Sequence, residues 1–118
     1  MSTTILVVDD EVFIVDLLAT LLEDEGYTVL RAYDGEQGLA VATQSHPHLI
    51  ITDIMMPKMS GTELATQVRA QLNGTAAIPI VLMSAVNASV SLPNTTYLPK
   101  PFDIDRVLDL VRDLTPGA

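Results

Sequence analysis

The stretch Ile5-Leu6-Val7-Val8-Asp9-Asp10-Glu11 decides the fold of this chain, because a short apolar run passes directly into acidic residues. A continuous apolar run of this length is typical of a strand covered on both faces of a sheet. Three more apolar runs end in a similar way: Leu49 to Thr52 before Asp53, Ile80 to Met83 before Ser84, and Tyr97 to Pro99 before Lys100. In parallel strands these polar groups meet at the carboxyl edge of one sheet, where open α/β folds bind ligands.

Helical patterns alternate with the strand patterns from end to end, which predicts an α/β fold with a parallel sheet. Val12, Val15, Leu18 and Leu22 keep helical spacing, and Gly26 is a natural helix stop. We also expect a strand over Tyr27–Arg31 and a helix over Gly35–Gln44. A third helix begins at a capping box of Ser60 and Glu63 and ends at Asn73-Gly74, and Asp103 is the candidate N-cap of the last helix.

The connection between the last two strands is unusually short. Only fifteen residues lie between Ser84 and Lys100, and they must end one strand, cross over and begin the next. A parallel crossover usually takes roughly a dozen residues or more and includes a helix. The stretch 87–96 contains Pro93 and many poor helix formers. We therefore expect one helical turn there at most.

Composition narrows the class of protein. A length of 118 residues predicts a single domain over 1–118, and we expect no output domain. The net charge of −9, from 15 acidic and 6 basic residues, argues against a nucleic-acid partner. No apolar run approaches the roughly 18 residues of a membrane span, and the uncharged start argues against a signal peptide. With no cysteine as well, we expect a cytoplasmic protein without membrane association.

The polar groups at the strand ends suit a divalent cation and a phosphoryl group. Asp9, Asp10 and Asp53 would repel one another unless a cation lay among them or their pKa values rose. Magnesium is the expected cation, because it is a hard ion that prefers oxygen ligands. The alternative for Asp9-Asp10 alone is a helix N-terminus, where carboxylates cap N–H groups and favour the dipole. Ser84 and Lys100 mean little singly, and the combination in strand order carries the prediction.

The chain resembles the receiver domain of two-component response regulators, of the stand-alone single-domain type. The resemblance rests on Val7–Glu11, on Thr52–Pro57 with Met59-Ser60-Gly61, on Ser84-Ala85 and on Tyr97–Phe102. It implies a doubly wound, flavodoxin-like sheet of five parallel strands in the order 2-1-3-4-5, with helices on both faces. The short fourth connection lacks roughly six residues, more than one helical turn, so helix 4 of the family is expected to be shortened or absent.

The resemblance also implies roles for single residues. Asp53 would be the phosphoacceptor, taking a phosphoryl group from a phosphohistidine of a sensor histidine kinase or phosphotransfer protein. Asp10 and Asp53 would bind Mg²⁺ directly, the backbone carbonyl of Met55 would be a further ligand, and Asp9 would act through water. Lys100 would neutralise phosphoryl charge.

Two further residues, Ser84 and Tyr97, would form the switch. The Ser84 hydroxyl would hydrogen-bond to a phosphoryl oxygen, and its movement would open space for Tyr97. The Lys100–Pro101 peptide bond would be cis. Met55 and Val86 are apolar and cannot orient a hydrolytic water, so we expect a long-lived acyl phosphate.

The leading hypothesis is therefore a phosphorylation-dependent signalling module that switches its binding to a downstream target protein, and not an enzyme in the usual sense. The alternative is a pseudo-receiver, a protein-binding scaffold that works without phosphorylation, which the short fourth connection keeps open. A small magnesium-dependent phosphatase is disfavoured, because its aspartyl nucleophile would be expected after the first strand and not after the third.

Overall fold

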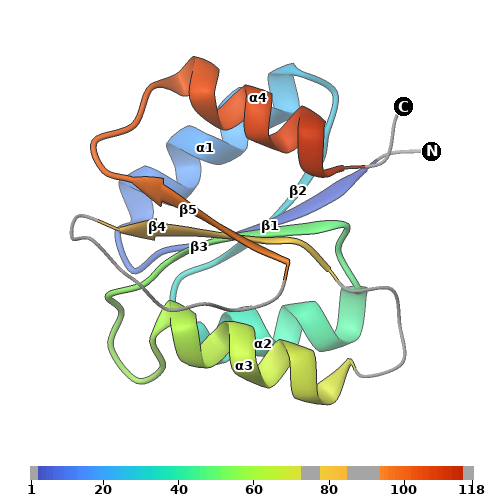
Figure 1. Cartoon of the computed structure of the whole chain (residues 1–118), viewed down its shortest axis with the longest axis vertical. Helices are drawn as coiled ribbons and strands as arrows, with labels where there is room; N and C mark the ends of the chain where they lie inside the picture. Colours follow the sequence, from blue (N-terminus) through green and yellow to red (C-terminus); the bar gives the residue numbers. More distant parts are fainter. Residues whose placement is uncertain (1–2, 73–77, 85–93, 116–118) are drawn as a thin grey trace.

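Five parallel strands form one sheet in the order β2-β1-β3-β4-β5, which confirms the predicted order. This computed structural model describes residues 3–72, 78–84 and 94–115. Figure 1 shows α1 and α4 on one face of the sheet and α2 and α3 on the other. The elements are β1 (Thr4–Val8), α1 (Val12–Asp24), β2 (Thr28–Ala32), α2 (Gly35–Ser45), β3 (Leu49–Asp53), α3 (Gly61–Gln71), β4 (Ile80–Ser84), β5 (Thr95–Pro99) and α4 (Ile104–Leu114).

The sheet has a hydrophobic core on each face, which explains why its central strands are continuously apolar. In β1, Ile5 and Val7 pack with α1 and α4, whereas Leu6 and Val8 pack on the side of α2 and α3. Every residue of β3 and β4 is buried. Successive side chains of a strand point to opposite faces, so a strand covered twice needs apolar residues at both sets of positions.

Several helix ends follow local sequence signals. Ser60 and Glu63 form the predicted capping box at the start of α3. Gly26, just after α1, has a φ of 96°, a left-handed conformation that glycine adopts without steric cost. Asp103 is the N-cap residue of α4, but its side chain makes no capping hydrogen bond among the described residues.

The part of the chain that the structure describes contains four helices, and α4 is the helix that follows β5. Strand β4 ends at Ser84 and β5 begins at Thr95. The prediction of one helical turn at most concerned residues 87–96, and most of this stretch, 87–93, lies outside the described residues. None of the described helices is long and apolar enough to cross a membrane.

The amino edge of the sheet is held by side chains that bond to backbone groups. Arg69 of α3 donates hydrogen bonds to the carbonyls of Ile78 (2.6 Å) and Asn94 (3.1 Å), just before β4 and β5. At the start of β1, the N–H of Thr4 donates to Nδ1 of His48 over 2.9 Å. These contacts fix where three strands begin.

Candidate functional site

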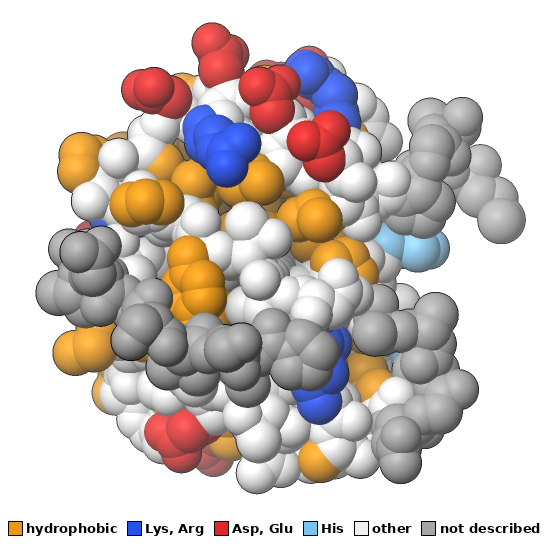
Figure 2. Space-filling model, in the orientation of Figure 1, with side chains coloured by type: hydrophobic (Ala, Val, Ile, Leu, Met, Phe, Trp, Pro, Cys, Tyr) orange, Lys and Arg blue, Asp and Glu red, His pale blue; other side chains and the backbone are white. Residues whose placement is uncertain are grey.

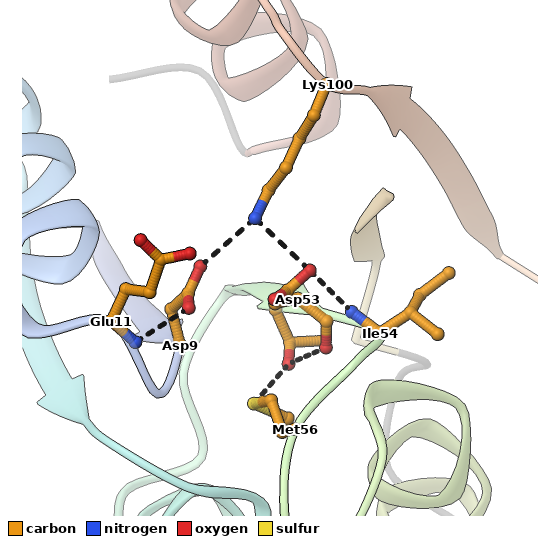
Figure 3. Close-up of polar contacts among 7 residues, drawn as sticks. Asp9, Glu11, Asp53, Ile54, Met56 and Lys100 are labelled. Carbon is orange, nitrogen blue, oxygen red and sulfur yellow. Dashed lines mark hydrogen bonds and ion pairs between the residues drawn. The ribbon is translucent and has the colours of Figure 1, made fainter. Parts of the chain in front are cut away.

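The carboxyl edge of the sheet gathers the polar groups that the sequence places at the strand ends. Asp9 follows β1, Asp53 ends β3, Ser84 ends β4 and Lys100 follows β5. The spatial order of these strands is β1-β3-β4-β5, so the four residues stand along one edge. Figure 3 shows Lys100 pointing between Asp9 and Asp53. The positions expected from the sequence are therefore brought together.

One lysine bridges two carboxylates at this edge. Lys100 Nζ lies 3.5 Å from Asp9 Oδ2 and 3.3 Å from Asp53 Oδ1. The same Oδ1 of Asp53 accepts the N–H of Ile54 over 3.0 Å. Among the described residues, every ion pair and hydrogen bond of the Asp53 carboxylate falls on Oδ1. Its second oxygen, Oδ2, makes no ion pair or hydrogen bond among the described residues.

The three carboxylates are close enough to share a cation. Asp9, Asp10 and Asp53 each offer an oxygen within 4.8 Å of the others. Asp9 is fully buried and Asp53 is 7% exposed, whereas Asp10 is exposed to solvent. Oδ2 of Asp9 accepts no hydrogen bond among the described residues. An excess of acidic oxygens, one of them buried with an ion pair but no hydrogen bond, suits a hard divalent cation such as Mg²⁺.

Helix capping explains only part of this acidic cluster. Oδ1 of Asp9 accepts the N–H of Glu11 over 2.9 Å, at the entry to α1. The N-cap residue itself is Glu11, and it makes no side-chain capping hydrogen bond among the described residues. Capping therefore accounts for one oxygen of Asp9; Oδ2 instead pairs with Lys100, and the gathering of three carboxylates is not explained by capping.

The pKa values at the site reflect burial and mutual charge. Burial raises the pKa of the Asp9 carboxyl to about 6, and the negative charge of Asp53 adds to the rise. Burial alone would lower the pKa of the Lys100 ammonium, but the attraction of Asp9 and Asp53 outweighs it, so that pKa is raised. Lys100 is therefore protonated at neutral pH, whereas burial makes the ionised form of Asp9 less favourable than it is in water.

The two predicted switch residues lie on neighbouring strands. Ser84 is buried at 4% exposure, and its carbonyl accepts the N–H of Lys100 over 2.7 Å. Tyr97 is half-buried, lies beside Leu82 in the strand register and packs in the core on the α2 and α3 side. Because Leu82 and Ser84 are two residues apart on one strand, Ser84 and Tyr97 share a face of the sheet. The Lys100–Pro101 peptide bond is cis.

Sequence patterns did not reveal Asp34 and Lys58, whose side chains form an ion pair of 3.7 Å between the start of α2 and the loop that follows Asp53. Lys58 belongs to the loop after Asp53, and Asp34 is the N-cap residue of α2. The only signal in the sequence is the Asp34-Gly35 pair, which reads as an ordinary helix start. Nothing in the spacing of the two residues predicts their contact.

Comparison with known proteins identifies the family. The model of the response regulator receiver domain matches residues 5–112, so the chain belongs to the response regulator receiver family. Sporulation initiation phosphotransferase F of Bacillus subtilis is 32% identical over 122 residues, covering 98% of this chain and 96% of that protein. Receiver domains are signalling modules of two-component systems, in which response regulators take phosphoryl groups from histidine kinases.

Two further relatives bear on the wider protein and on the metal. The chain is 37% identical over 116 residues to the DNA-binding dual master transcriptional regulator RpaA of Synechocystis sp., covering 93% of this chain and 48% of that protein. It thus spans about half the length of the first curated relatives that it matches. A receiver domain of a Pseudomonas aeruginosa sensor histidine kinase is 25% identical, with a TM-score of 0.84 and coverage of 97% of this chain and 98% of that chain. That structure has a magnesium ion coordinated in its active site cleft.

Proposed function

We propose that this receiver domain accepts a phosphoryl group on Asp53 from a sensor histidine kinase or phosphotransfer protein, with Mg²⁺ bound beside it. Phosphorylation then switches the binding of a downstream target protein. The observation that carries the proposal is the Asp53 carboxylate, held 3.3 Å from Lys100 within a cluster of three carboxylates. Catalysis of phosphoryl transfer depends mainly on positioning the reacting groups and neutralising the charge on the phosphoryl oxygens, and this arrangement provides both.

Asp53 is the proposed nucleophile. Its Oδ1 is held by Lys100 and by the N–H of Ile54, which leaves Oδ2 to attack the phosphorus of a phosphohistidine. A bond between oxygen and phosphorus forms while the bond between phosphorus and nitrogen breaks. The electron pair of the broken bond stays on the imidazole nitrogen, which takes a proton, and Asp53 becomes an acyl phosphate.

Asp10 and Asp53 are the proposed direct ligands of Mg²⁺, with the carbonyl of Met55 as a third and Asp9 acting through water. When bound, the ion supplies neutralisation of charge on the phosphoryl oxygens. Lys100 supplies a second positive charge beside Asp9 and Asp53, and its raised pKa keeps it protonated.

Ser84 and Tyr97 are the proposed switch. A phosphoryl group on Asp53 adds acceptor oxygens at the edge where Ser84 ends β4, so the Ser84 hydroxyl is drawn towards them. Since Ser84 and Tyr97 share a face of the sheet, this movement opens space into which the half-buried Tyr97 ring turns. The change in Tyr97 alters the surface that a target protein reads.

An apolar surface beside the site fits the docking of the phosphodonor. Phe13 of α1 is 71% exposed, and Met55, in the loop after Asp53, is 72% exposed. Between α1 and the segment after β5 lies a groove of about 440 Å³ that is lined by Glu11, Ile14, Leu17, Lys100, Pro101 and Phe102. Because Lys100 belongs both to the groove and to the site, a protein seated there holds its phosphoryl group near Asp53.

We propose no nucleic-acid partner for this chain itself. Figure 2 shows acidic side chains gathered over α4, whose exposed residues include Asp105, Asp109 and Asp113. Together with the net charge of −9, this surface repels phosphate backbones. The DNA binding named for RpaA is a property of a protein about twice as long.

The experiment is phosphorylation by acetyl phosphate in the presence of Mg²⁺, followed by intact-protein mass spectrometry. The chain should gain about 80 Da, one phosphoryl group. The gain should disappear in Asp53→Asn and in EDTA. Asp16→Asn is the matched control, because Asp16 is an exposed carboxylate on α1 that pairs with Arg31, and it should keep the gain.

The same experiment tests the alternative of a pseudo-receiver. A folded chain that gains no mass with acetyl phosphate, nor with a panel of phosphorylated histidine kinases, would support a phosphorylation-independent scaffold. A mass gain that survives in Asp53→Asn would contradict the choice of phosphoacceptor.

A further inference from the structure

The loop of residues 54–60, between β3 and α3, is closed at its neck. The N–H of Gly61 donates to the carbonyl of Ile54 over 2.9 Å. Gly61 also lies directly against the backbone of the phosphoacceptor, since a Cβ at this position would overlap the carbonyl oxygen of Asp53. The neck is therefore fixed to the strand that carries Asp53.

The tip of this loop is strained. The N–H of Met59 donates to the carbonyl of Pro57 over 2.8 Å, and Lys58 between them has a φ of 70°. This combination is a γ-turn of the positive-φ type, which is rare and strained. Residues other than glycine adopt such a backbone at a cost and keep it only where the surroundings impose it.

The tip of the loop contacts the start of α2. Lys58 Nζ lies 3.7 Å from Asp34 Oδ2, and the Asp34 side chain is only 15% exposed. The other oxygen of Asp34 accepts the N–H of Gln37 over 2.8 Å and caps α2. Gly35 lets the loop come close, because a Cβ there would overlap the carbonyl oxygen and Cβ of Met59.

The proposed metal ligand of the loop lies between these two anchors. Only Met55 and Met56 separate Ile54 at the neck from Pro57, where the γ-turn begins. The Met55 side chain is 72% exposed, so its own packing contributes little to fixing the position of its carbonyl. The carbonyl is therefore positioned through the backbone, from the neck on one side and the tip on the other.

We propose that Asp34 and Lys58 are positioning residues for the cation site, and that their ion pair holds the loop so that the Met55 carbonyl faces the cation. This inference rests on the proposed function, because it concerns the same Mg²⁺ site. Neither residue touches the cation. Both act through the strained turn.

The sign of the mutational effects separates positioning from simple electrostatics. Lys58→Met removes a positive charge, which by Coulomb attraction alone would tighten the binding of a cation nearby. Asp34→Asn removes a negative charge, which by the same argument would weaken binding. If the ion pair positions the loop, both substitutions weaken Mg²⁺ binding. Asn retains an oxygen that can cap α2, so the helix start is preserved.

The experiment measures the Mg²⁺ dissociation constant of the full chain by isothermal titration calorimetry, with unfolding by urea in EDTA as a second measurement. Lys58→Met and Asp34→Asn should each raise the constant about two- to fivefold, the range expected for one ion pair at a partly exposed site. The double variant should be no weaker than either single variant, because both remove the same contact. Arg112→Met is the control, since it removes an exposed ion pair with Glu25 away from the site and should leave the constant unchanged.

Tighter binding in Lys58→Met, or constants unchanged in both single variants, would overturn the inference. An additive loss in the double variant would also overturn it, because the residues would then act separately. Absence of Mg²⁺ binding in the unmutated chain is a different result, since it would count against the proposed function itself.

Discussion

The two edges of the sheet both hold charged side chains in partly buried places, but they do so in opposite ways. At the amino edge, one cation, Arg69, donates to the carbonyls of Ile78 and Asn94. At the carboxyl edge, Asp9, Asp10 and Asp53 lie close together, but Lys100 pairs only with Asp9 and Asp53. One oxygen of Asp9 has no hydrogen bond among the described residues. The first arrangement matches a donor to acceptors, and the second leaves negative charge in excess.

We interpret the amino edge as contributing to the stability of the fold and the carboxyl edge as serving the proposed function. Two neutral carbonyls accept hydrogen bonds from Arg69 without adding negative charge, so these contacts stabilise the starts of β4 and β5, although Nε of Arg69 is buried without a hydrogen bond among the described residues. Crowded carboxylates cost free energy unless a cation arrives, and a site of this kind is retained for what it binds. Removing the charge of Arg69 at the amino edge should therefore lower the free energy of unfolding. Removing a carboxylate charge at the carboxyl edge should raise it.

The largest expected effect is at the amino edge. Arg69→Met should lower the free energy of unfolding by about 2–4 kcal/mol, because two carbonyls lose a charged donor at a partly buried place. The Mg²⁺ dissociation constant of the folded fraction should not change. Urea unfolding in EDTA and calorimetric titration measure the two quantities, and Arg106→Met on the exposed side of α4 is the control. A parallel loss of Mg²⁺ affinity would show that the edges are not independent.

At the carboxyl edge, we expect removal of a charge to change the free energy of unfolding in the opposite direction. Asp9→Asn should raise the free energy of unfolding by about 1–2 kcal/mol at pH 7 in EDTA, because an amide of the same shape needs no buried charge. The same substitution should weaken Mg²⁺ binding, so that the unmutated chain becomes the more stable one once Mg²⁺ is saturating. Lower stability of Asp9→Asn without metal would mean that the attraction of Lys100 outweighs the cost of burial.

The pH dependence of stability follows from the same carboxyl. Burial raises the pKa of Asp9 from its ordinary value of 3.8 to about 6 in the fold, so the folded state binds more protons between these values. The contribution of Asp9 to stability is thus complete below the lower value and is lost as the pH rises through the upper one. Unfolding measured in EDTA from pH 4 to 7 should show this loss in the unmutated chain. The loss should be absent from Asp9→Asn.

The sequence predicts most of the fold and the composition of the site, for a physical reason. A strand covered on both faces must be apolar throughout, so the ends of β1, β3 and β4 are marked where polar residues begin. Strand order then follows from the resemblance to receiver domains, and with it the meeting of Asp9, Asp53 and Lys100. The strand over 27–31 was predicted one residue early, since β2 is Thr28–Ala32, and such errors are usual at element ends.

What the sequence did not predict is the set of contacts between loops and helices that are distant along the chain. Arg69 donates a hydrogen bond to Asn94, and Lys58 pairs with Asp34. In neither pair does the separation along the sequence follow a helix or strand periodicity. Each contact depends on how closely two segments approach in the folded chain, as Gly35 permits for Met59. Apolar periodicity records which face of an element is buried, and it holds no information about such approaches.

The smallest expected effect concerns Met55, on the exposed rim of the carboxyl edge. Here the question is whether a side chain can position water for hydrolysis of the acyl phosphate. Met55 is 72% exposed and has no group that can orient a water molecule towards an acyl phosphate on Asp53. Val86, the second apolar residue in this prediction, lies outside the described residues. Met55→Gln adds an amide that can hold such a water, and one hydrogen bond in the transition state should shorten the lifetime of the acyl phosphate about two- to fivefold.

The lifetime is measured by following the loss of the phosphorylated mass after excess acetyl phosphate is removed. Met55→Leu is the matched control, because it keeps an apolar side chain of similar size and should leave the lifetime unchanged. Folding stability should be the same in both variants, since an exposed side chain on this rim contributes little to it. A lifetime of seconds in the unmutated chain, or one that glutamine fails to shorten, would mean that Met55 does not protect the acyl phosphate. In that case the carboxyl edge would control hydrolysis through its buried charges alone, and the rim would serve only for docking.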